Sequence, residues 1–213
     1  MIVLKLGGSL LSRAELKQFL QLASRDGQGQ VVIVPGGGVF ADQVRLTQQQ
    51  WQYDDRTAHC MAILAMQQMA LLFRGLCARL VIVDQVELIR SRLQQQNVVI
   101  WSPLPSELDA AGIAANWQVT SDTLAAWLAV QLSIDHLILV KSAEFSAGCS
   151  IEQLSTLGII DQAFAEFVQD HPLTIDCISY HQLYPNRQLK KACLNIPQPV
   201  HLFIHSRLDR AVC

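Results

Sequence analysis

The chain has 213 residues, of which 51 % are hydrophobic and 16 % charged, and its formal net charge is −2 at pH 7. This length fits one α/β domain with enough apolar material for a core covered on both faces. The charge gives no reason to expect a nucleic-acid partner. The start, MIVLKLGGSL, is too short and interrupted for a signal peptide, and Gln67 and Gln68 break the longest apolar stretch, so we expect no membrane span.

Strand-like and helix-like stretches alternate along the chain. Strands are expected at 2–6, 30–34, 79–83, 97–101, 135–140, 173–178 and 199–204. Helices are expected at 13–25, 38–50, 55–75, 85–95, 121–132, 151–157 and 161–169, with N-caps at Ser12, Asp84 and either Thr120 or Ser121. Several strand runs are continuously apolar, which is typical of parallel strands buried on both faces. The pattern predicts one domain over residues 1–213, with an open, mostly parallel sheet between helices.

The six cysteines and six histidines are scattered along the sequence. No two cysteines form a CxxC pair, and no histidine follows at zinc-finger spacing. We therefore expect reduced thiols, a cytoplasmic location and no structural metal site.

Two glycine-rich loops each follow a predicted strand, KLGGSL at 5–10 and PGGG at 35–38. Ligands of parallel α/β sheets bind beyond the carboxyl ends of the strands, so both loops are expected at one edge. Glycines at a strand-to-helix turn leave backbone N–H groups open to phosphate. Lys5, at the end of an apolar strand, needs an anionic partner, and phosphoryl transfer needs positioned positive charge. The loops indicate a phosphate site, although each alone is also explained as a tight turn.

A dinucleotide site is a second hypothesis for the same glycines. Gly36, Gly38 and Ala41 fit the pattern GxGxxA after a strand. That fingerprint requires an acidic residue at the end of the next strand, whereas Asp54 and Asp55 flank a predicted helix. The P-loop pattern GxxxxGK[ST] does not occur in the sequence.

The strings KLGGSL, VVIVPGGG, TSDTLAAWLA and LILVK have the order and spacing of the amino acid kinase superfamily, which the chain resembles over residues 1–45 and 118–145. The resemblance implies a three-layer αβα sandwich around a mostly parallel sheet of about eight strands. It implies transfer of the γ-phosphoryl group of ATP, with Mg²⁺, to a small-molecule phosphate, carboxylate or hydroxyl. It places the acceptor on the N-terminal part and the nucleotide on the C-terminal part, and suggests a homo-oligomer, with a dimer as the simplest state.

Specific residues follow from the resemblance. Lys5, Asp122 and Lys141 would be catalytic, with Asp122 orienting the lysines. The nucleotide would bind the amides of Gly7, Gly8 and Ser9, together with Lys141 and Ser142. The acceptor would lie against Gly36, Gly37 and Gly38.

Plainer explanations exist for single residues: Asp122 suits the first turn of any helix, and Lys141 suits a strand end that reaches solvent. The chain also departs from the family pattern. KSAEF at 141–145 lacks the glycine of the common VDGV, and residues 149–164 contain no lysine where many members carry one. These departures favour an alternative, a nucleotide- or anion-binding relative without catalysis.

Residues 54–70, DDRTAHCMAILAMQQMA, begin acidic and turn apolar. Asp55 and His59 are spaced i, i+4 and would share one helix face. A carboxylate suits a cationic amine and an imidazole suits a phosphate, so both residues are candidate acceptor ligands. The stretch resembles a short group of the family that converts an aminomethylfuran methyl phosphate to its diphosphate, on the route to methanofuran. A capped first turn followed by a core stripe explains the same residues.

Overall fold

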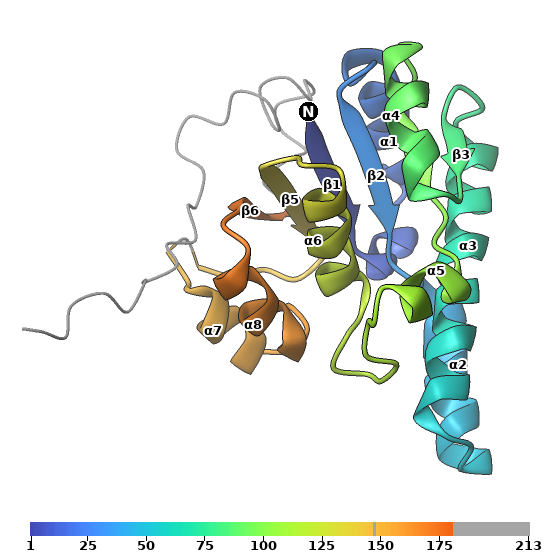
Figure 1. The fold of residues 1–213 in the computed structure, drawn as a ribbon, viewed down its shortest axis with the longest axis vertical. Helices are drawn as coiled ribbons and strands as arrows, with labels where there is room; N and C mark the ends of the chain where they lie inside the picture. The colour runs from blue at the N-terminus through green and yellow to red at the C-terminus, as the bar shows by residue number, and fades with distance from the viewer. Residues whose placement is uncertain (147, 181–213) are drawn as a thin grey trace, which may run out of the picture.

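The computed structural model describes residues 1–146 and 148–180, and within these ranges six strands form one parallel sheet (Figure 1). The strand order is β3-β4-β2-β1-β5-β6. The bounds are β1 Ile2–Leu6, β2 Val31–Pro35, β3 Val81–Val83, β4 Val99–Trp101, β5 His136–Lys141 and β6 Thr174–Ser179. The predicted α/β class is confirmed. The described ranges hold six strands rather than about eight, and the strand expected at 199–204 lies outside them.

Eight α-helices and one 3₁₀ helix join these strands in the described ranges. They are η1 Gly8–Ser12, α1 Leu16–Asp26, α2 Gly38–Trp51, α3 Asp55–Leu76, α4 Val86–Gln94, α5 Pro105–Ala110, α6 Ser121–Gln131, α7 Ile151–Thr156 and α8 Gln162–Asp170. All seven predicted helices are present, whereas η1 and α5 were missed. The N-cap of α6 is Thr120, as one alternative had it. Ser12 ends η1 instead of capping α1, and the N-cap of α4 is Gln85 rather than Asp84.

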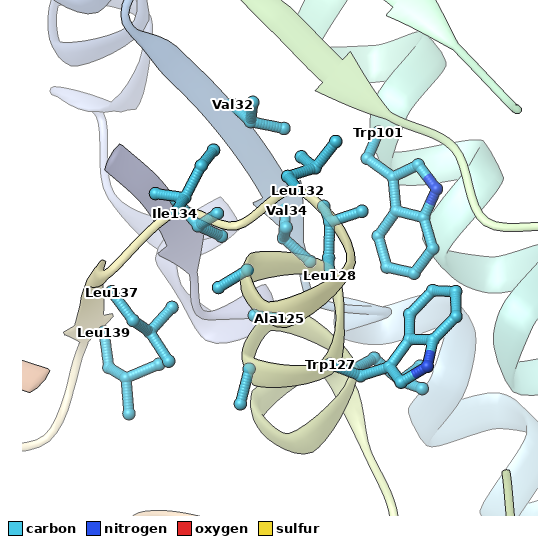
Figure 2. Packing of buried hydrophobic residues seen from close by; sticks show 14 of the residues in the cluster. Val32, Val34, Trp101, Ala125, Trp127, Leu128, Leu132, Ile134, Leu137 and Leu139 are labelled. Atoms are coloured by element: carbon cyan, nitrogen blue, oxygen red, sulfur yellow. The ribbon is translucent and has the colours of Figure 1, made fainter. Parts of the chain in front are cut away.

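The two faces of the sheet take alternate residues of each strand, because successive side chains of a strand point to opposite sides. Val3, Leu137 and Leu139 belong to the core on the side of α6, and Figure 2 shows part of this cluster. In it the rings of Trp101 and Trp127 lie 5.7 Å apart between centroids. The opposite face carries its own apolar cluster against α1 and the second half of α3. Helices therefore cover both faces, as the three-layer prediction requires.

Helix α6 occupies a central place in this arrangement. Its residues from Ser121 to Ala129 are all buried, and it contacts β1, β2 and β5 as well as α8. A helix buried on every side must be apolar all round, which explains the sequence LAAWLAV. Its N-terminus points toward the carboxyl edge of the sheet, where β1 and β5 end (Figure 1).

Two further observations bear on the expectations from composition. No helix in the described ranges is both long and apolar enough to cross a membrane. The four cysteines in those ranges, Cys60, Cys77, Cys149 and Cys177, are free thiols.

Candidate functional site

One buried carboxylate holds two buried lysines at the carboxyl edge of the sheet. Lys5 Nζ lies 2.8 Å from Asp122 Oδ1, and Lys141 Nζ lies 2.6 Å from Asp122 Oδ2. The three residues are 4 %, 7 % and 3 % exposed for Lys5, Lys141 and Asp122 respectively. The structure thus brings together the three residues that the sequence analysis singled out as catalytic, from three separate elements.

The positions of the lysines follow from strand register. β1 and β5 pair in parallel with Lys5 opposite Leu139, so Lys141 follows two residues further along on the same face. That face is the one covered by α6, whose first turn carries Asp122. A carboxylate in the first turn of a helix is favoured by the helix dipole, and two ammonium groups compensate its burial.

Burial and mutual charge set the ionisation of this cluster. Burial lowers the pKa of Lys5 from 10.5 to about 8, Asp122 opposes that shift, and Lys141 adds to it. Burial alone would raise the pKa of Asp122, but Lys141 and Lys5 outweigh it and hold the pKa at about 2. With both lysines protonated the cluster carries one net positive charge, which suits an anionic ligand such as phosphate.

The two glycine loops pack directly against each other. A Cβ on Gly8 would lie 2.1 Å from the backbone N of Gly38, and a Cβ on Gly36 would lie 2.6 Å from the N of Gly8. Only glycine fits at such distances. Part of the glycine pattern is therefore explained by contact between the two loops, whereas the sequence had suggested a phosphate ligand or a tight turn at each loop.

Backbone hydrogen bonds decide which amides of the first loop are open to a ligand. The Gly7 N–H donates to Val140 O at 3.0 Å, and the Gly36 N–H donates to Leu6 O at 2.8 Å. In the described ranges the N–H groups of Gly8 and Ser9 donate to no protein acceptor. The Ser9 hydroxyl lies 2.6 Å from that of Ser142, which joins the loop to the end of β5.

A pocket of about 600 Å³ opens beside the charged cluster. Asp122 and Thr120 line it at the start of α6, and residues 158–162 line it at the start of α8. Arg45 lines it from α2, and Trp117 lines it from the loop between α5 and α6. The Arg45 guanidinium carbon lies 4.4 Å from the centroid of the Trp117 ring. The pocket is therefore lined at one place by Asp122, the carboxylate that pairs with both lysines, and at another by the cationic Arg45 and the aromatic Trp117.

The two acceptor candidates from residues 54–70 fall in different places. Asp55 is exposed and lines the pocket, and its Oδ1 accepts from Gln48 Nε2 at 2.9 Å. His59 is 7 % exposed and is not part of the pocket wall, and burial lowers its pKa. The glycines 36–38 also lie outside that wall. Of the predicted acceptor ligands, only Asp55 reaches the pocket.

Sequence reasoning missed several lining residues. Trp117 donates from Nε1 to Gln48 Oε1 at 2.6 Å, so Gln48 links the indole to Asp55. Asp161, which also lines the pocket, accepts hydrogen bonds at the start of α6. Trp117 and Asp161 belong to no recognisable sequence motif, because their hydrogen-bond partners lie about 40 to 70 positions away in the chain.

The dinucleotide hypothesis receives no support from these elements. Asp54 caps the N-terminus of α3, where its side chain accepts from the Thr57 N–H at 2.8 Å. It therefore starts a helix, whereas the fingerprint needs a carboxylate at a strand end. The fold and the site instead define an α/β protein in which a buried Lys–Asp–Lys cluster and two packed glycine loops lie at the carboxyl edge of the sheet.

The Amino acid kinase family model matches residues 1–144, and the chain belongs to that family. It is accordingly an ATP-dependent phosphotransferase. The chain is 23 % identical over 145 residues to the [5-(aminomethyl)furan-3-yl]methyl phosphate kinase of Methanocaldococcus jannaschii, a match that covers 68 % of this chain and 67 % of that protein.

Solved structures share the fold at low sequence identity. The uridylate kinase of Archaeoglobus fulgidus matches with a TM-score of 0.61 at 19 % identity, covering 82 % of this chain and 88 % of that one. The UMP kinase of Bacillus anthracis gives 0.65 at 16 % identity, covering 91 % of both chains. An isopentenyl phosphate kinase gives 0.55 at 14 % identity, covering 84 % and 91 %.

Proposed function

We propose that this chain transfers the γ-phosphoryl group of ATP to the phosphate of a small organic phosphate, giving a diphosphate. The observation that carries the proposal is the cluster of Lys5, Asp122 and Lys141, which sets two ammonium groups beside a pocket and an open glycine loop. Phosphoryl transfer depends mainly on positioning and on positive charge around the migrating group. A site that only bound a nucleotide would not need a buried carboxylate to fix both lysines.

The residues present fit the phosphates of ATP. The free N–H groups of Gly8 and Ser9 are suited to phosphate oxygens, and the close packing of Gly8 on Gly38 leaves no side chain over them. Lys141 and Ser142 lie at the end of β5 beside that loop. The Gly7 amide, expected to share this task, is occupied by Val140 O.

Mg²⁺ is expected to enter with the nucleotide. No three His, Cys, Asp or Glu side chains gather into a metal cluster in the described ranges, and Asp122 is occupied by two lysines. Mg²⁺ is commonly held by substrate phosphates with one or two carboxylates, so a dedicated protein cage is not required. When bound, it would neutralise charge on the phosphates that the lysines also face.

The acceptor chemistry is proposed from the pocket. Asp55 contributes an exposed carboxylate to the pocket, and Asp122, which also lines the wall, is paired with the ammonium groups of Lys5 and Lys141. A small molecule with a cationic amine at one end and a phosphate at the other complements both. [5-(Aminomethyl)furan-3-yl]methyl phosphate, the substrate in the name of the curated relative, has this arrangement, and we propose it or a close analogue as acceptor. This would place the chain in methanofuran biosynthesis.

The test is an ATP-to-ADP assay with Mg²⁺ against aminomethylfuran methyl phosphate, isopentenyl phosphate, uridylate, acetylglutamate, aspartate and glutamate. We expect turnover with the aminomethylfuran phosphate and formation of its diphosphate. Turnover with a different phosphate would correct the acceptor and keep the reaction. ATP binding without turnover on any acceptor would favour a non-catalytic nucleotide-binding relative, and no ATP binding would overturn the proposal.

We also keep two proposals from the sequence. The first is a homo-oligomer, with a dimer as the simplest state. It is supported by an exposed apolar stripe on α3, which contains Met61, Leu64 and Leu71. The second is a single domain in a cytoplasmic protein, with the acceptor on the N-terminal part and the nucleotide on the C-terminal part.

A further inference from the structure

The side chain of Asp161 accepts five hydrogen bonds. Its Oδ2 accepts from the Thr120 N–H at 3.0 Å, the Thr120 hydroxyl at 2.8 Å and the Thr123 N–H at 3.0 Å. Its Oδ1 accepts from the Thr123 hydroxyl at 2.5 Å and from the Phe164 N–H at 3.0 Å. One carboxylate thus binds the starts of two helices, α6 and α8.

This carboxylate replaces the local cap of α6. Thr120 is the N-cap residue, but its own side chain makes no capping hydrogen bond to the helix. An N-cap side chain normally accepts from the third helical N–H, and a capping box also binds the N–H of the N-cap residue. Asp161 performs both tasks for α6 from 41 positions away, and it caps α8 in the ordinary way.

Asp122 lies between the two residues that Asp161 holds. Thr120 precedes it by two positions and Thr123 follows it directly, so the backbone is anchored on both sides of the carboxylate that pairs with Lys5 and Lys141. The lysines are fixed by the pairing of β1 and β5, whereas α6 approaches them from another layer. The position of Asp122 between them therefore depends on where α6 begins.

We propose that Asp161 is a positioning residue for phosphoryl transfer: by clamping the first turn of α6 to the start of α8, it sets Asp122 between the two catalytic lysines. The proposal rests on the proposed function for its kinetic consequences. It assigns no direct contact with substrate to Asp161, although this residue lines the pocket. A carboxylate has about four lone-pair sites, and five donors already use them, so little capacity remains for a metal ion or an amine.

A first experiment measures the site without any substrate. The chain has five lysines, Lys5, Lys17, Lys141, Lys190 and Lys191, so the titration of the Lys5 ammonium can be followed by NMR of lysine-labelled protein. Lys5 faces Asp122 from α6 and Lys141 from β5, and the Cys177 thiol of β6, whose pKa burial raises to about 12, stays neutral nearby. In Asp161→Asn, displacement of Asp122 removes an attraction that favours the charged lysine. We expect the pKa of Lys5 to fall by about one unit from the wild-type value.

A second experiment measures turnover on the acceptor that the assay identifies. Asp161→Asn is expected to lower kcat about 10–100-fold with little change in the acceptor KM, because misplacement of a catalytic group costs rate more than binding. Thr123→Val removes the hydroxyl hydrogen bond to Asp161 and should also lower kcat and the pKa of Lys5. Thr123→Ser keeps that hydrogen bond, so kcat and the Lys5 titration should stay close to those of the wild type. If Asp161→Asn does not fold, the comparison of Thr123→Val with Thr123→Ser tests the positioning role of Asp161 instead.

Glu107 provides a matched control. It lies on α5, and its Oε1 accepts from the Val86 N–H at 3.1 Å, so it also binds the start of another helix, α4, at a distance in sequence. Glu107→Ala removes this acceptor, so it should lower thermal stability and leave the Lys5 titration unchanged. If Asp161→Asn or Thr123→Val lowers the melting temperature but leaves the Lys5 titration at the wild-type value, Asp161 is a helix cap only and the proposal is overturned. Absence of turnover in the wild type would count against the proposed function and leave the NMR test intact.

Discussion

Gly8 and Gly38 lie in loops that follow neighbouring strands, and their backbones approach so closely that a Cβ on Gly8 would be 2.1 Å from the Gly38 N. Neither strand alone requires this contact. It arises because β1 and β2 pair in parallel and end together, at Leu6 and Pro35. The free amides of the first loop are therefore held in place by the second loop.

Gly8→Ala is the first prediction from this contact. The added methyl group meets backbone atoms, which cannot rotate away, so the loops must separate. We expect a loss of about 1–3 kcal/mol in unfolding free energy, as for overpacked sites, together with a raised KM for ATP. Chemical denaturation and steady-state kinetics measure both. Gly75→Ala, in the last turn of α3 with nothing within 4 Å of the added Cβ, is the control and should be stable or slightly stabilised.

Lys5→Ala tests charge stabilisation. If Lys5 acts on the transferring phosphoryl group, kcat should fall roughly 10²–10⁴-fold with little change in the acceptor KM. Lys17→Ala removes an exposed lysine of α1 and should leave kcat unchanged. Unchanged turnover in Lys5→Ala would exclude Lys5 from the mechanism.

The ionisation of Lys5 predicts how activity depends on pH. Its pKa of about 8 means that the ammonium is lost as the pH rises through 8, so kcat/KM for ATP should decline above this pH by up to tenfold per unit. A plot of log kcat/KM against pH gives the value directly. A flat profile to pH 10 would show that the charge of Lys5 is not required.

The contribution of Lys5 to folding stability should rise with pH between about 8 and 10.5, where activity is expected to fall. The pKa of Lys5 is lower in the folded chain than the ordinary 10.5, so between about 8 and 10.5 the unfolded chain binds more protons and Lys5 makes stability rise with pH. The pKa of Asp122 is depressed to about 2, so its contribution is present above the ordinary 3.8 and is lost as the pH falls toward 2. Denaturant midpoints of the wild type and of Lys5→Met, compared from pH 7 to 10.5, isolate the lysine's part. A wild-type curve parallel to that of the variant would contradict this account.

Asp55→Asn tests the acceptor proposal. Loss of the carboxylate should raise the KM of an amine-bearing acceptor by about 10–100-fold, the cost of a charge-assisted hydrogen bond, with the KM for ATP unchanged. The effect should vanish for an analogue in which the amine is replaced by a methyl group. Asp135→Asn, an exposed carboxylate just before β5 and therefore at the opposite edge of the sheet, is the control. Equal affinity of both variants for the amine would remove Asp55 from the site.

The α3 stripe gives a prediction on assembly. Leu71 is 62 % exposed and Leu64 is 48 % exposed, and with Met61 they recur at helical spacing on a 22-residue helix. If a second copy covers this face, Leu71→Glu should shift a dimer toward monomer in light scattering coupled to size exclusion. Leu157→Glu replaces a leucine that is 64 % exposed elsewhere and should not. A wild type that runs as a monomer would contradict the homo-oligomer proposal.

Local patterns in the sequence predicted the sheet and most helices, because strand and helix periodicities are local properties. Helix α5 was not predicted because its six residues are too few to show a helical periodicity of apolar residues. Lys5, Asp122 and Lys141 could be proposed singly, but their meeting depends on strand register and on the layer that α6 occupies. His59 shares a helix face with Asp55 in sequence, yet it is buried while Asp55 is exposed. The role of Asp161 depends on partners in another helix, for which no sequence pattern exists.

Within the charged cluster, burial disfavours the charged form of Lys5 and lowers its pKa to about 8. Phosphate oxygens beside it would favour the ammonium and raise that pKa. We therefore expect nucleotide binding near pH 8 to be accompanied by proton uptake. The heat of binding will depend on the ionisation enthalpy of the buffer, and the affinity for ATP will weaken as the solution becomes more alkaline. The burial of Lys5 would thus make nucleotide affinity depend on the pH of the solution.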